Sequence, residues 1–367
     1  MRSLLSMARE AGGGGPPPDP AAEVEGDCWA VFAFDVGHEI DLARAGAGLA
    51  ELPGQHPFRH RAGTSTQVVA RSIRLQLATP ALALGGFRSA ASAHATVHAL
   101  GAVSLAWRIP VASSAAEAAA LAGLLHDDPS VAEEARAVAA RVLQLAGDAV
   151  ARPRLSPLYE DYVVFHLRKA PAERARLAGI LRAEPAALSL QEEESALEAP
   201  ISYAPSESCY VDWLGSVLVG MDMEDELRVL ELANVTLLEL RVLDAELTSA
   251  VDEAYDALAR GWKGFSAFAP RARELGRVAQ LQADGAVLYE SVKNAHKLFG
   301  DDYLARLHGR ALQRFRVADW DASIQRKLTA LASVYGQLSD RASQRRSEAL
   351  EWIIIILIAA DLVAYLS

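Results

Sequence analysis

Hydrophobic and polar residues alternate in short runs along the first 220 residues, which is the pattern of β-strands. The run CWAVFAFDV at 28–36 is rich in aromatic and β-branched residues, and Gly37 follows it as a turn residue. Residues 73–77 alternate strictly between apolar and polar side chains, as a half-buried strand does. The other predicted strands cover residues 67–77, 94–109 (ended by Pro110), 158–167 and 209–219.

Helical spacing appears between these strands. The Ala/Leu-rich segments 115–125 and 131–150 are predicted helices, and a shorter helix is predicted at 173–182. Because the strands alternate and are not continuously apolar, we expect an α+β fold for residues 27–221 and not a buried parallel sheet.

The pattern changes after Met221. From Met223 to Ala259 the chain has neither proline nor glycine, and 11 of the 17 residues from Leu227 to Leu243 are apolar. This stretch predicts a long helix that is buried on most of its surface. Further helices are predicted at 271–298, 302–315 and 319–348, and together they suggest an antiparallel bundle or coiled coil over 222–348. The expected seam of the last helix is Ile324, Leu328, Leu331, Val334 (or Tyr335) and Leu338.

The chain closes on the apolar run WIIIILIAADLVAYLS at 352–367. A helix over 350–366 would be about 25 Å long, the short limit for a hydrocarbon core of about 30 Å. Ten or so apolar residues favour insertion by roughly 3–6 kcal/mol, and Asp361 opposes it by about 3 kcal/mol. We therefore expect a membrane helix at 349–367; a buried core or oligomerisation helix is the alternative. The expected anchor residues are Trp352, Ile353, Ile354, Ile355, Ile356, Leu357, Ile358 and Tyr365, with a basic flank of Arg341, Arg345 and Arg346.

Composition and charge narrow the function classes. The 36 Lys+Arg against 47 Asp+Glu give a net charge of −11, which argues against general binding to phosphate backbones. Two cysteines cannot form a disulfide framework or a four-thiolate metal site. Residues 1–26 contain glycine and proline runs and no signal-peptide core, so a disordered arm is expected there.

Charge is also distributed unevenly along the second half. Residues 186–256 hold 17 acids and two arginines, whereas residues 270–346 hold 14 Lys/Arg and eight acids. Either these acidic and basic segments lie against one another, or the basic segment faces an anionic membrane or RNA. The sequence leaves both alternatives open.

The usual catalytic motifs are missing from the sequence: it has no nucleophile elbow, zinc-protease motif, Cys-x-x-Cys pair or phosphate loop. His38-Glu39-x-Asp41 and His126-Asp127-Asp128 could in principle bind a metal, but a solvated turn and a helix cap are the commoner roles. We therefore expect a non-enzymatic protein without cofactor or metal. An enzyme with a site assembled from dispersed residues, such as a pocket around His38, Glu39 or His126, stays open.

Three stretches resemble a known family: CWAVFAFDVGHEIDL near the start, ELANVTLLELRVLDAEL at 231–247, and LEWIIIILIAADL at 350–362. They are similar to the domain-of-unknown-function family that includes the "required for meiotic nuclear division" proteins of eukaryotes and many bacterial proteins. The resemblance covers under a fifth of the chain. The sequence departs from the family at Asp361, where a glutamate is usual nearby, and in a long insertion after Leu258. It implies a mixed domain followed by helices that end in a membrane segment, with no catalytic residues to transfer.

The sequence thus predicts four parts: an arm at 1–26, an α+β domain at 27–221, a helical domain at 222–348 and a membrane helix at 349–367. The expected function is a non-enzymatic, tail-anchored scaffold or partner-binding module. Its body would face the cytoplasm, and its helical half would form a homo-oligomer. The alternative is a soluble RNA- or ribosome-associated factor that uses the basic 270–346 helices, with Arg310, Arg314 and Arg316 as contacts.

Overall fold

The computed structural model of the 367-residue chain describes residues 23–49, 72–259, 280, 283, 302–334, 336–337, 351 and 354–355. The chain forms two compact units. Unit 1 comprises Met1–Val242 and Val292–Ala318, and unit 2 comprises Leu243–Ser291 and Asp319–Ser367. Most of the arm expected at 1–26 lies outside the described residues.

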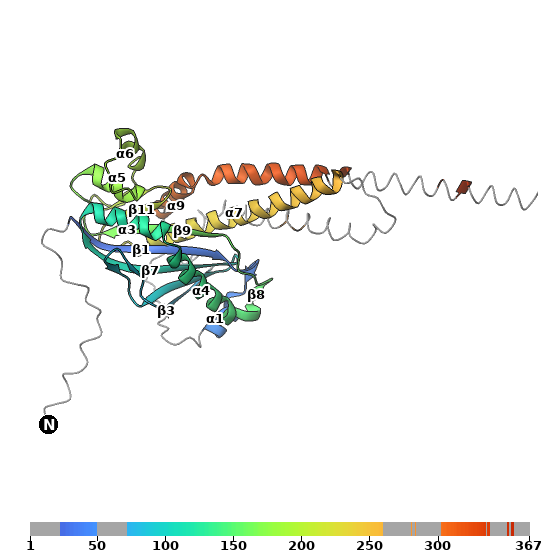
Figure 1. Cartoon of the computed structure of the whole chain (residues 1–367), viewed down its shortest axis with the longest axis horizontal. Helices are drawn as coiled ribbons and strands as arrows, with labels where there is room; N and C mark the ends of the chain where they lie inside the picture. The colour runs from blue at the N-terminus through green and yellow to red at the C-terminus, as the bar shows by residue number, and fades with distance from the viewer. Residues whose placement is uncertain are drawn as a thin grey trace, which may run out of the picture. The chain divides into compact units, whose positions relative to one another are not determined.

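A seven-stranded sheet in the order β10-β11-β9-β1-β7-β6-β3 is the centre of unit 1 (Figure 1). Its strands are β1 (Val24–Asp35), β3 (Ser72–Ala78), β6 (Ser92–His98), β7 (Ala102–Ser113), β9 (Tyr159–Leu167), β10 (Ser208–Val211) and β11 (Gly215–Val219). β11 pairs with β9 in parallel, whereas the other pairs of this sheet are antiparallel. The mixed sheet with separate helices confirms the α+β prediction.

The remaining elements of unit 1 are short strands and helices around this sheet. The short strands are β2 (Glu39–Ile40) with β8 (Val150–Ala151), and β4 (Ala83–Leu84) with β5 (Phe87–Arg88). The helices are α1 (Leu42–Leu49), α3 (Ala115–Asp127), α4 (Pro129–Ala146), α5 (Arg174–Arg182), α6 (Leu190–Ala196), α9 (Asp302–Arg314) and a 3-10 turn (Gly147–Ala149); α7 (Glu224–Ala259) crosses from unit 1 into unit 2.

Two predicted single strands are hairpins. Residues 94–109 divide into β6 and β7 at a turn in which Gly101 has φ +103°, a conformation that favours glycine. Residues 209–219 divide into β10 and β11. The predicted stop at Pro110 is wrong, because β7 runs on to Ser113. Its regular pairing with β6 ends at Trp107, so Pro110 lies where one side of the strand has no ladder to interrupt.

One face of the sheet packs on the α3, α4 and α5 helices. Phe32 and Phe34 of β1 point to this face, together with Trp107 of β7, and all three are buried in one core with Leu121 of α3. The indole Nε1 of Trp107 donates to Thr79 Oγ1 at 3.1 Å, so its polar atom is satisfied inside the core. Alternation along β1 therefore places Phe32 and Phe34 on the face that α3, α4 and α5 cover.

The opposite face is covered by the first half of α7. Ala33 and Ala102 pack there against Val235, Leu238 and Val242 of the helix. The sheet thus lies between two helical layers, and the prediction of burial on most of the helix surface is confirmed for residues Leu227 to Leu243 of α7.

Unit 2 includes the second half of α7 and a helix that covers residues 319–334. Lys327 Nζ lies 2.7 Å from Asp244 Oδ1 and 2.6 Å from Thr248 Oγ1, and Ser323 Oγ donates to Asp244 at 3.0 Å. The earlier residue Ser323 contacts Asp244, and the later residue Lys327 also reaches Thr248, one turn further along α7. The residue numbers therefore increase in the same direction along both helices, so the helices are parallel. The predicted antiparallel long-helix bundle is not shown, and the seam residue Leu338 lies outside the described residues.

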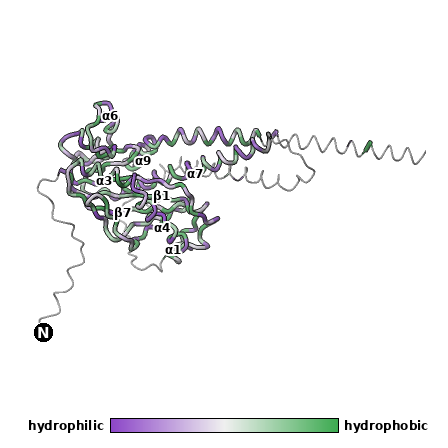
Figure 2. Tube along the Cα trace, viewed as in Figure 1, coloured by the Kyte–Doolittle hydropathy of each residue, from purple (hydrophilic) through white to green (hydrophobic). Residues whose placement is uncertain are grey.

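The predicted membrane anchor is contradicted. In the part of the chain that the structure describes, none of the helices combines the length and the apolar character that crossing a bilayer requires. Hydrophilic positions recur along the described long helices, as Figure 2 shows. The insertion free energy expected from the sequence was only slightly favourable, because the apolar run is at the short limit of length for a membrane helix and includes Asp361.

The corrections extend to the lipid partner, the membrane location and the tail-anchored scaffold, which all depended on the anchor. Of the anchor residues, Ile354 and Ile355 are helical and each 54% exposed. The other predicted anchor and flank residues lie outside the described residues; they are Trp352, Ile353, Ile356, Leu357, Ile358, Tyr365, Arg341, Arg345 and Arg346. Homo-oligomerisation stays a prediction.

Candidate ligand-binding site

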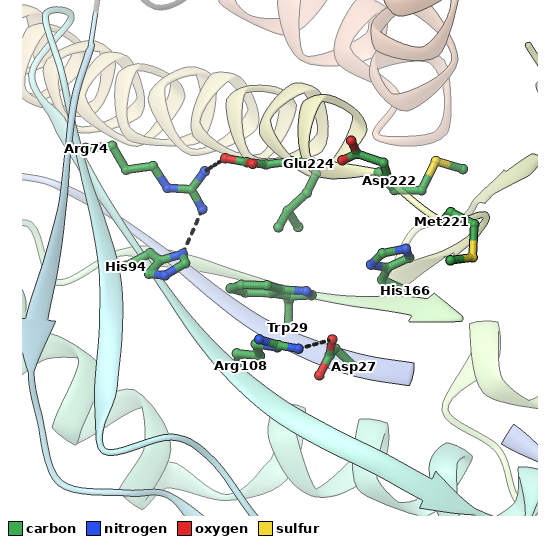
Figure 3. A pocket seen from close by; sticks show the side chains of 11 residues that line it. Asp27, Trp29, Arg74, His94, Arg108, His166, Met221, Asp222 and Glu224 are labelled. Atoms are coloured by element: carbon green, nitrogen blue, oxygen red, sulfur yellow. Dashed lines mark hydrogen bonds and ion pairs between the residues drawn. The ribbon is translucent and has the colours of Figure 1, made fainter. Parts of the chain in front are cut away.

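A cavity of about 250 Å³ lies between the sheet and the start of α7 (Figure 3). Its lining combines guanidinium, imidazole, carboxylate and indole groups with thioethers and one leucine. The lining residues are Asp27, Trp29, Arg74, His94, Arg108, His166, Met221, Asp222, Met223, Glu224 and Leu227. They come from five strands, from the connection that follows β11, and from the first turn of α7.

Strand pairing brings the distant residues of this site together. Trp29 of β1 is the cross-strand partner of Arg108 on β7, and Asp27 is the partner of His166 on β9. Side chains of such pairs lie on the same face of a sheet. Because side chains alternate along β1, Asp27 and Trp29 both point away from the apolar core and toward the layer of α7.

Arg108 and Asp27 form an ion pair at the edge of the cavity. The distance from Arg108 Nη2 to Asp27 Oδ2 is 2.8 Å, and the arginine side chain is 57% exposed. The hydrogen bond to Asp27 raises the pKa of Arg108, so this group stays cationic. A guanidinium carries five N–H donors, so one bond to Asp27 leaves donors for a ligand.

Arg74 and His94 form the opposite, more buried part of the lining. Arg74 Nη2 lies 3.0 Å from His94 Nδ1. Because a guanidinium can only donate, Nδ1 is the acceptor and the proton of the neutral ring is on Nε2. Burial and the adjacent Arg74 charge lower the pKa of His94 to about 4, which agrees with a neutral imidazole.

A buried polar network continues from Arg74 toward α7. Glu231 of α7 is only 4% exposed and accepts a hydrogen bond from Ser104, whose Oγ lies 2.9 Å from His98 Nε2. Burial raises the pKa of Glu231, but the Arg74 charge, His98 and hydrogen bonds to Ser104 and Thr96 outweigh it and hold the pKa below its ordinary value. A carboxylate of the helix and a guanidinium of the sheet therefore compensate each other beneath the cavity.

His166 and two methionines complete the lining. His166 Nε2 lies 3.0 Å from the Gly220 carbonyl, which can only accept, so Nε2 carries a proton. In the neutral ring Nδ1 then keeps its lone pair. Met223 is buried against Gly220, whereas Met221 is 84% exposed.

The structure places the residues that the sequence suggested as metal ligands elsewhere. Asp41 Oδ1 accepts from the backbone of Ala43 at 3.1 Å and so caps the start of α1. His126 belongs to the last turn of α3 and bonds to Asp161, and Asp128 caps α4 through Ser130, which confirms the interpretation as a cap. Within the described ranges, no three His, Cys, Asp or Glu side chains gather as a metal site would require.

The basic helices proposed for RNA binding do not support that alternative. Arg310 donates to the Glu198 carbonyl at 2.6 Å, and Arg314 donates to the Val211 carbonyl at 3.1 Å. Both arginines belong to unit 1, and both side chains are largely buried. These contacts join the basic segment to the acidic one, which is the first of the two arrangements considered from the sequence.

Fold and cavity together define a class of protein: an α+β domain with a small cavity lined by charged side chains. The chain belongs to the family described as "Uncharacterized protein MJ0711, N-terminal domain", whose model matches residues 25–226, more than half of the chain. The matched range includes ten of the 11 lining residues; only Leu227 lies beyond it.

One similar protein is "Uncharacterized protein MJ0711" of Methanocaldococcus jannaschii, 25% identical over 174 residues. The match covers 47% of this chain and 52% of that protein, so the chain spans about half the length of the curated relative. No solved structure matches the chain. These findings do not show the expected link to the "required for meiotic nuclear division" proteins.

Proposed function

We propose that unit 1 is a binding module for a small organic anion, bearing a carboxylate or phosphate group. The observation that carries the proposal is that Arg74 and Arg108 line one cavity together with the indole of Trp29. Guanidinium groups bind carboxylates and phosphates through parallel N–H donors, and an indole supplies apolar surface for the rest of a ligand.

Burial favours this use of Arg74. Its side chain is only 7% exposed, and charge-assisted hydrogen bonds strengthen where water is excluded. The cavity of about 250 Å³ lies below the range of about 300–1,000 Å³ that drug-sized ligands occupy. The proposed ligand is therefore a metabolite-sized anion and not a nucleotide or a peptide.

We propose binding without catalysis. Two of the lining carboxylates are already engaged by guanidinium groups: Asp27 by Arg108 at 2.8 Å and Glu224 by Arg228 at 3.0 Å. These two carboxylates are therefore held in ion pairs and are not presented to a ligand as general bases. Proton NMR spectra of a bound ligand should stay unchanged over days of incubation with the full chain; product signals would contradict this part of the proposal.

Isothermal titration of the full chain with butyrate and with butyramide tests anion binding. The two ligands match in size and differ in charge, so butyrate should bind and butyramide should bind at least about tenfold more weakly. Equal affinities would overturn the proposal.

Two arginine variants form a matched pair for the same titration. Arg108 pairs with Asp27 at 2.8 Å and lines the cavity, whereas Arg168 pairs with Glu25 at 2.5 Å and does not. Both arginines are exposed and both partners are on β1. Arg108→Ala should weaken butyrate binding by about tenfold, and Arg168→Ala should leave it unchanged. Equal losses would point to a general charge effect.

A further inference from the structure

Half of the methionines of the chain line this one cavity. The chain has four methionines: Met1 and Met7 are at the start of the sequence, whereas Met221 and Met223 lie in the connection between β11 and α7. Both of the latter contribute to the cavity lining. Thioether sulfur is a soft metal ligand. The connection therefore supplies two soft donors to one cavity.

Strand topology brings an imidazole close to these thioethers. β11 is parallel to β9, and Leu218 of β11 pairs with His166 of β9. Parallel strands end at the same edge of a sheet, so the chain that leaves β11 passes beside the end of β9. The Gly220 N–H donates to the Leu167 carbonyl at 3.1 Å, which extends the pairing to the residue before Met221.

The orientation of His166 suits a metal ligand. Figure 3 shows its ring at the end of the cavity where Met221 lies, with Arg74 and His94 at the other end. The Nε2–H of His166 donates to the Gly220 carbonyl at 3.0 Å, so the lone pair of the neutral ring is on Nδ1. Imidazoles that bind metals in proteins usually donate their other N–H to a carbonyl or carboxylate, which fixes the ring and its tautomer. Nδ1 is therefore the atom that a metal would meet.

Gly220 also has the thioether of Met223 against it. A Cβ on Gly220 would stand 3.0 Å from Met223 Cε and 3.3 Å from Met223 Sδ. The residue whose carbonyl holds His166 thus packs on one of the two sulfur atoms as well. Met223 is 2% exposed, whereas Met221 is 84% exposed. A methionine side chain is unbranched and has three rotatable bonds, so Met221 can close over an ion from the open side of the cavity.

We propose that His166 Nδ1, Met223 Sδ and Met221 Sδ form a binding site for Cu(I). All three donors are uncharged, thioethers select Cu(I), and imidazole suits copper. Zn²⁺ sites are built from thiolates, imidazoles and carboxylates, and no three side chains of these types gather within the described ranges. The site goes beyond the proposed function, because none of its ligands is an arginine that would bind the anion.

Competition with a coloured cuprous chelator tests the site on the full chain. Ascorbate under nitrogen keeps the copper as Cu(I), and bicinchoninate reports how much Cu(I) the protein withdraws. One equivalent of Cu(I) should bind. Zn²⁺, measured by isothermal titration, should bind at least about tenfold more weakly, because thioethers are not ligands that it prefers. No withdrawal of Cu(I), or equal binding of both ions, would overturn the proposal.

Single substitutions separate this site from other copper ligands of the chain. Leucine has nearly the volume of methionine and no sulfur, so Met221→Leu and Met223→Leu should keep the fold. Each should weaken Cu(I) binding by about tenfold or more, as should His166→Gln, since loss of even an outer partner of a metal ligand costs about 10–100-fold. Met7→Leu and His38→Gln remove the same groups elsewhere and should leave binding unchanged. Unchanged affinity in both Met221→Leu and Met223→Leu would place the ion at other ligands and contradict the proposal.

The methionine methyl groups give a direct readout of the two sulfur ligands. In the full chain labelled with ¹³C at these methyl groups, the signals of Met7, Met221 and Met223 are assigned by the leucine variants. One equivalent of Ag(I), a redox-stable ion with the charge of Cu(I), should shift the Met221 and Met223 signals together and leave the Met7 signal in place. No shift, or equal shifts of all the signals, would refute the site. Titration with butyrate in the absence of metal tests the proposed function separately, so either proposal can fail alone.

Discussion

Replacing Glu231 by glutamine is expected to destabilise unit 1 strongly, although the substitution conserves shape. Glu231 is 4% exposed and its carboxylate compensates the charge of Arg74, which is 7% exposed. Glutamine can still accept from Ser104, so the substitution removes the charge and keeps a hydrogen-bonding group. The guanidinium would then remain buried beside Glu224, whose Oε1 lies 3.8 Å from Arg74 Nη1 and whose side chain is half exposed.

The expected magnitude follows from the burial of both partners. Removing one member of a buried ion pair costs about 3–5 kcal/mol, because the other charge stays desolvated. Exposed pairs contribute only about 0–1 kcal/mol. The pair of Arg108 with Asp27 is a suitable reference, since it lies on the same face of the sheet with an arginine that is 57% exposed. Asp27→Asn should therefore cost about 1 kcal/mol or less.

Urea unfolding of the full chain, followed by circular dichroism, measures both losses. Glu231→Gln should lower the free energy of unfolding by several times as much as Asp27→Asn. A double variant in which methionine replaces both Arg74 and Glu231 should recover part of the loss, because it leaves no buried charge. If Glu231→Gln costs no more than Asp27→Asn, the buried pair does not fasten α7 to the sheet and this reasoning is wrong.

Three other substitutions test separate parts of the account. Because the pKa of His94 is about 4 in the folded chain and about 6.5 when unfolded, the unfolded state binds more protons between these values. The His94 contribution to the free energy of unfolding should therefore fall by up to about 3 kcal/mol as pH drops from 6.5 to 4, while Glu160, whose pKa burial raises to about 7, acts in the opposite direction. His94→Gln should remove the His94 contribution, so its stability should fall less on acidification than that of the unsubstituted chain, whereas His38→Gln should follow the unsubstituted chain. A Cβ at Gly26 would stand 2.1 Å from the His166 carbonyl oxygen, so Gly26→Ala should lower the midpoint of urea unfolding, whereas Gly309→Ala, with no atom within 4 Å, should not. Asp128→Ala removes the cap of α4 and should lower the midpoint in the same assay; an unchanged midpoint would contradict the capping role.

The elements that the sequence predicted well are those with a strong local signal. The aromatic and β-branched run at 28–36 corresponds to the C-terminal part of β1, which ends at Asp35, and the stretch without proline and glycine from Met223 to Ala259 corresponds to α7. Local sequence signals failed where the end of an element depends on the strand that pairs with it. Pro110 did not end its strand, because whether proline breaks a ladder depends on the neighbouring strand at that position.

The candidate site could not be predicted because its parts are dispersed. Asp27 and Leu227 are 200 residues apart in the chain, and no strand contributes more than two lining residues. Only strand register, which a single sequence does not specify, places Trp29 beside Arg108. One signal was available: Glu231 and Asn234 are polar residues inside a mostly apolar stretch of α7, and such residues are buried only with polar partners.

The membrane prediction failed for a related physical reason. It treated the apolar residues at 352–367 as an isolated helix and summed their transfer energies, which left a favourable margin of only a few kcal/mol. A margin of that size is comparable to the energy of a single charged residue in the run, here Asp361. Periodicity and composition indicate which secondary structure a segment prefers. A binding site or a membrane location also depends on residues that are distant in the sequence.

Side-chain NMR of the full chain labelled with ¹⁵N-arginine tests the cavity as a ligand site most directly. The Nε–H signals of Arg74, Arg108 and Arg168 are assigned by single substitutions and followed while butyrate is added. We expect the Arg74 and Arg108 signals to shift together along one saturable curve while the Arg168 signal stays in place. Shifts of all three signals in parallel, or no shift at saturating ligand, would contradict a binding site between the sheet and α7.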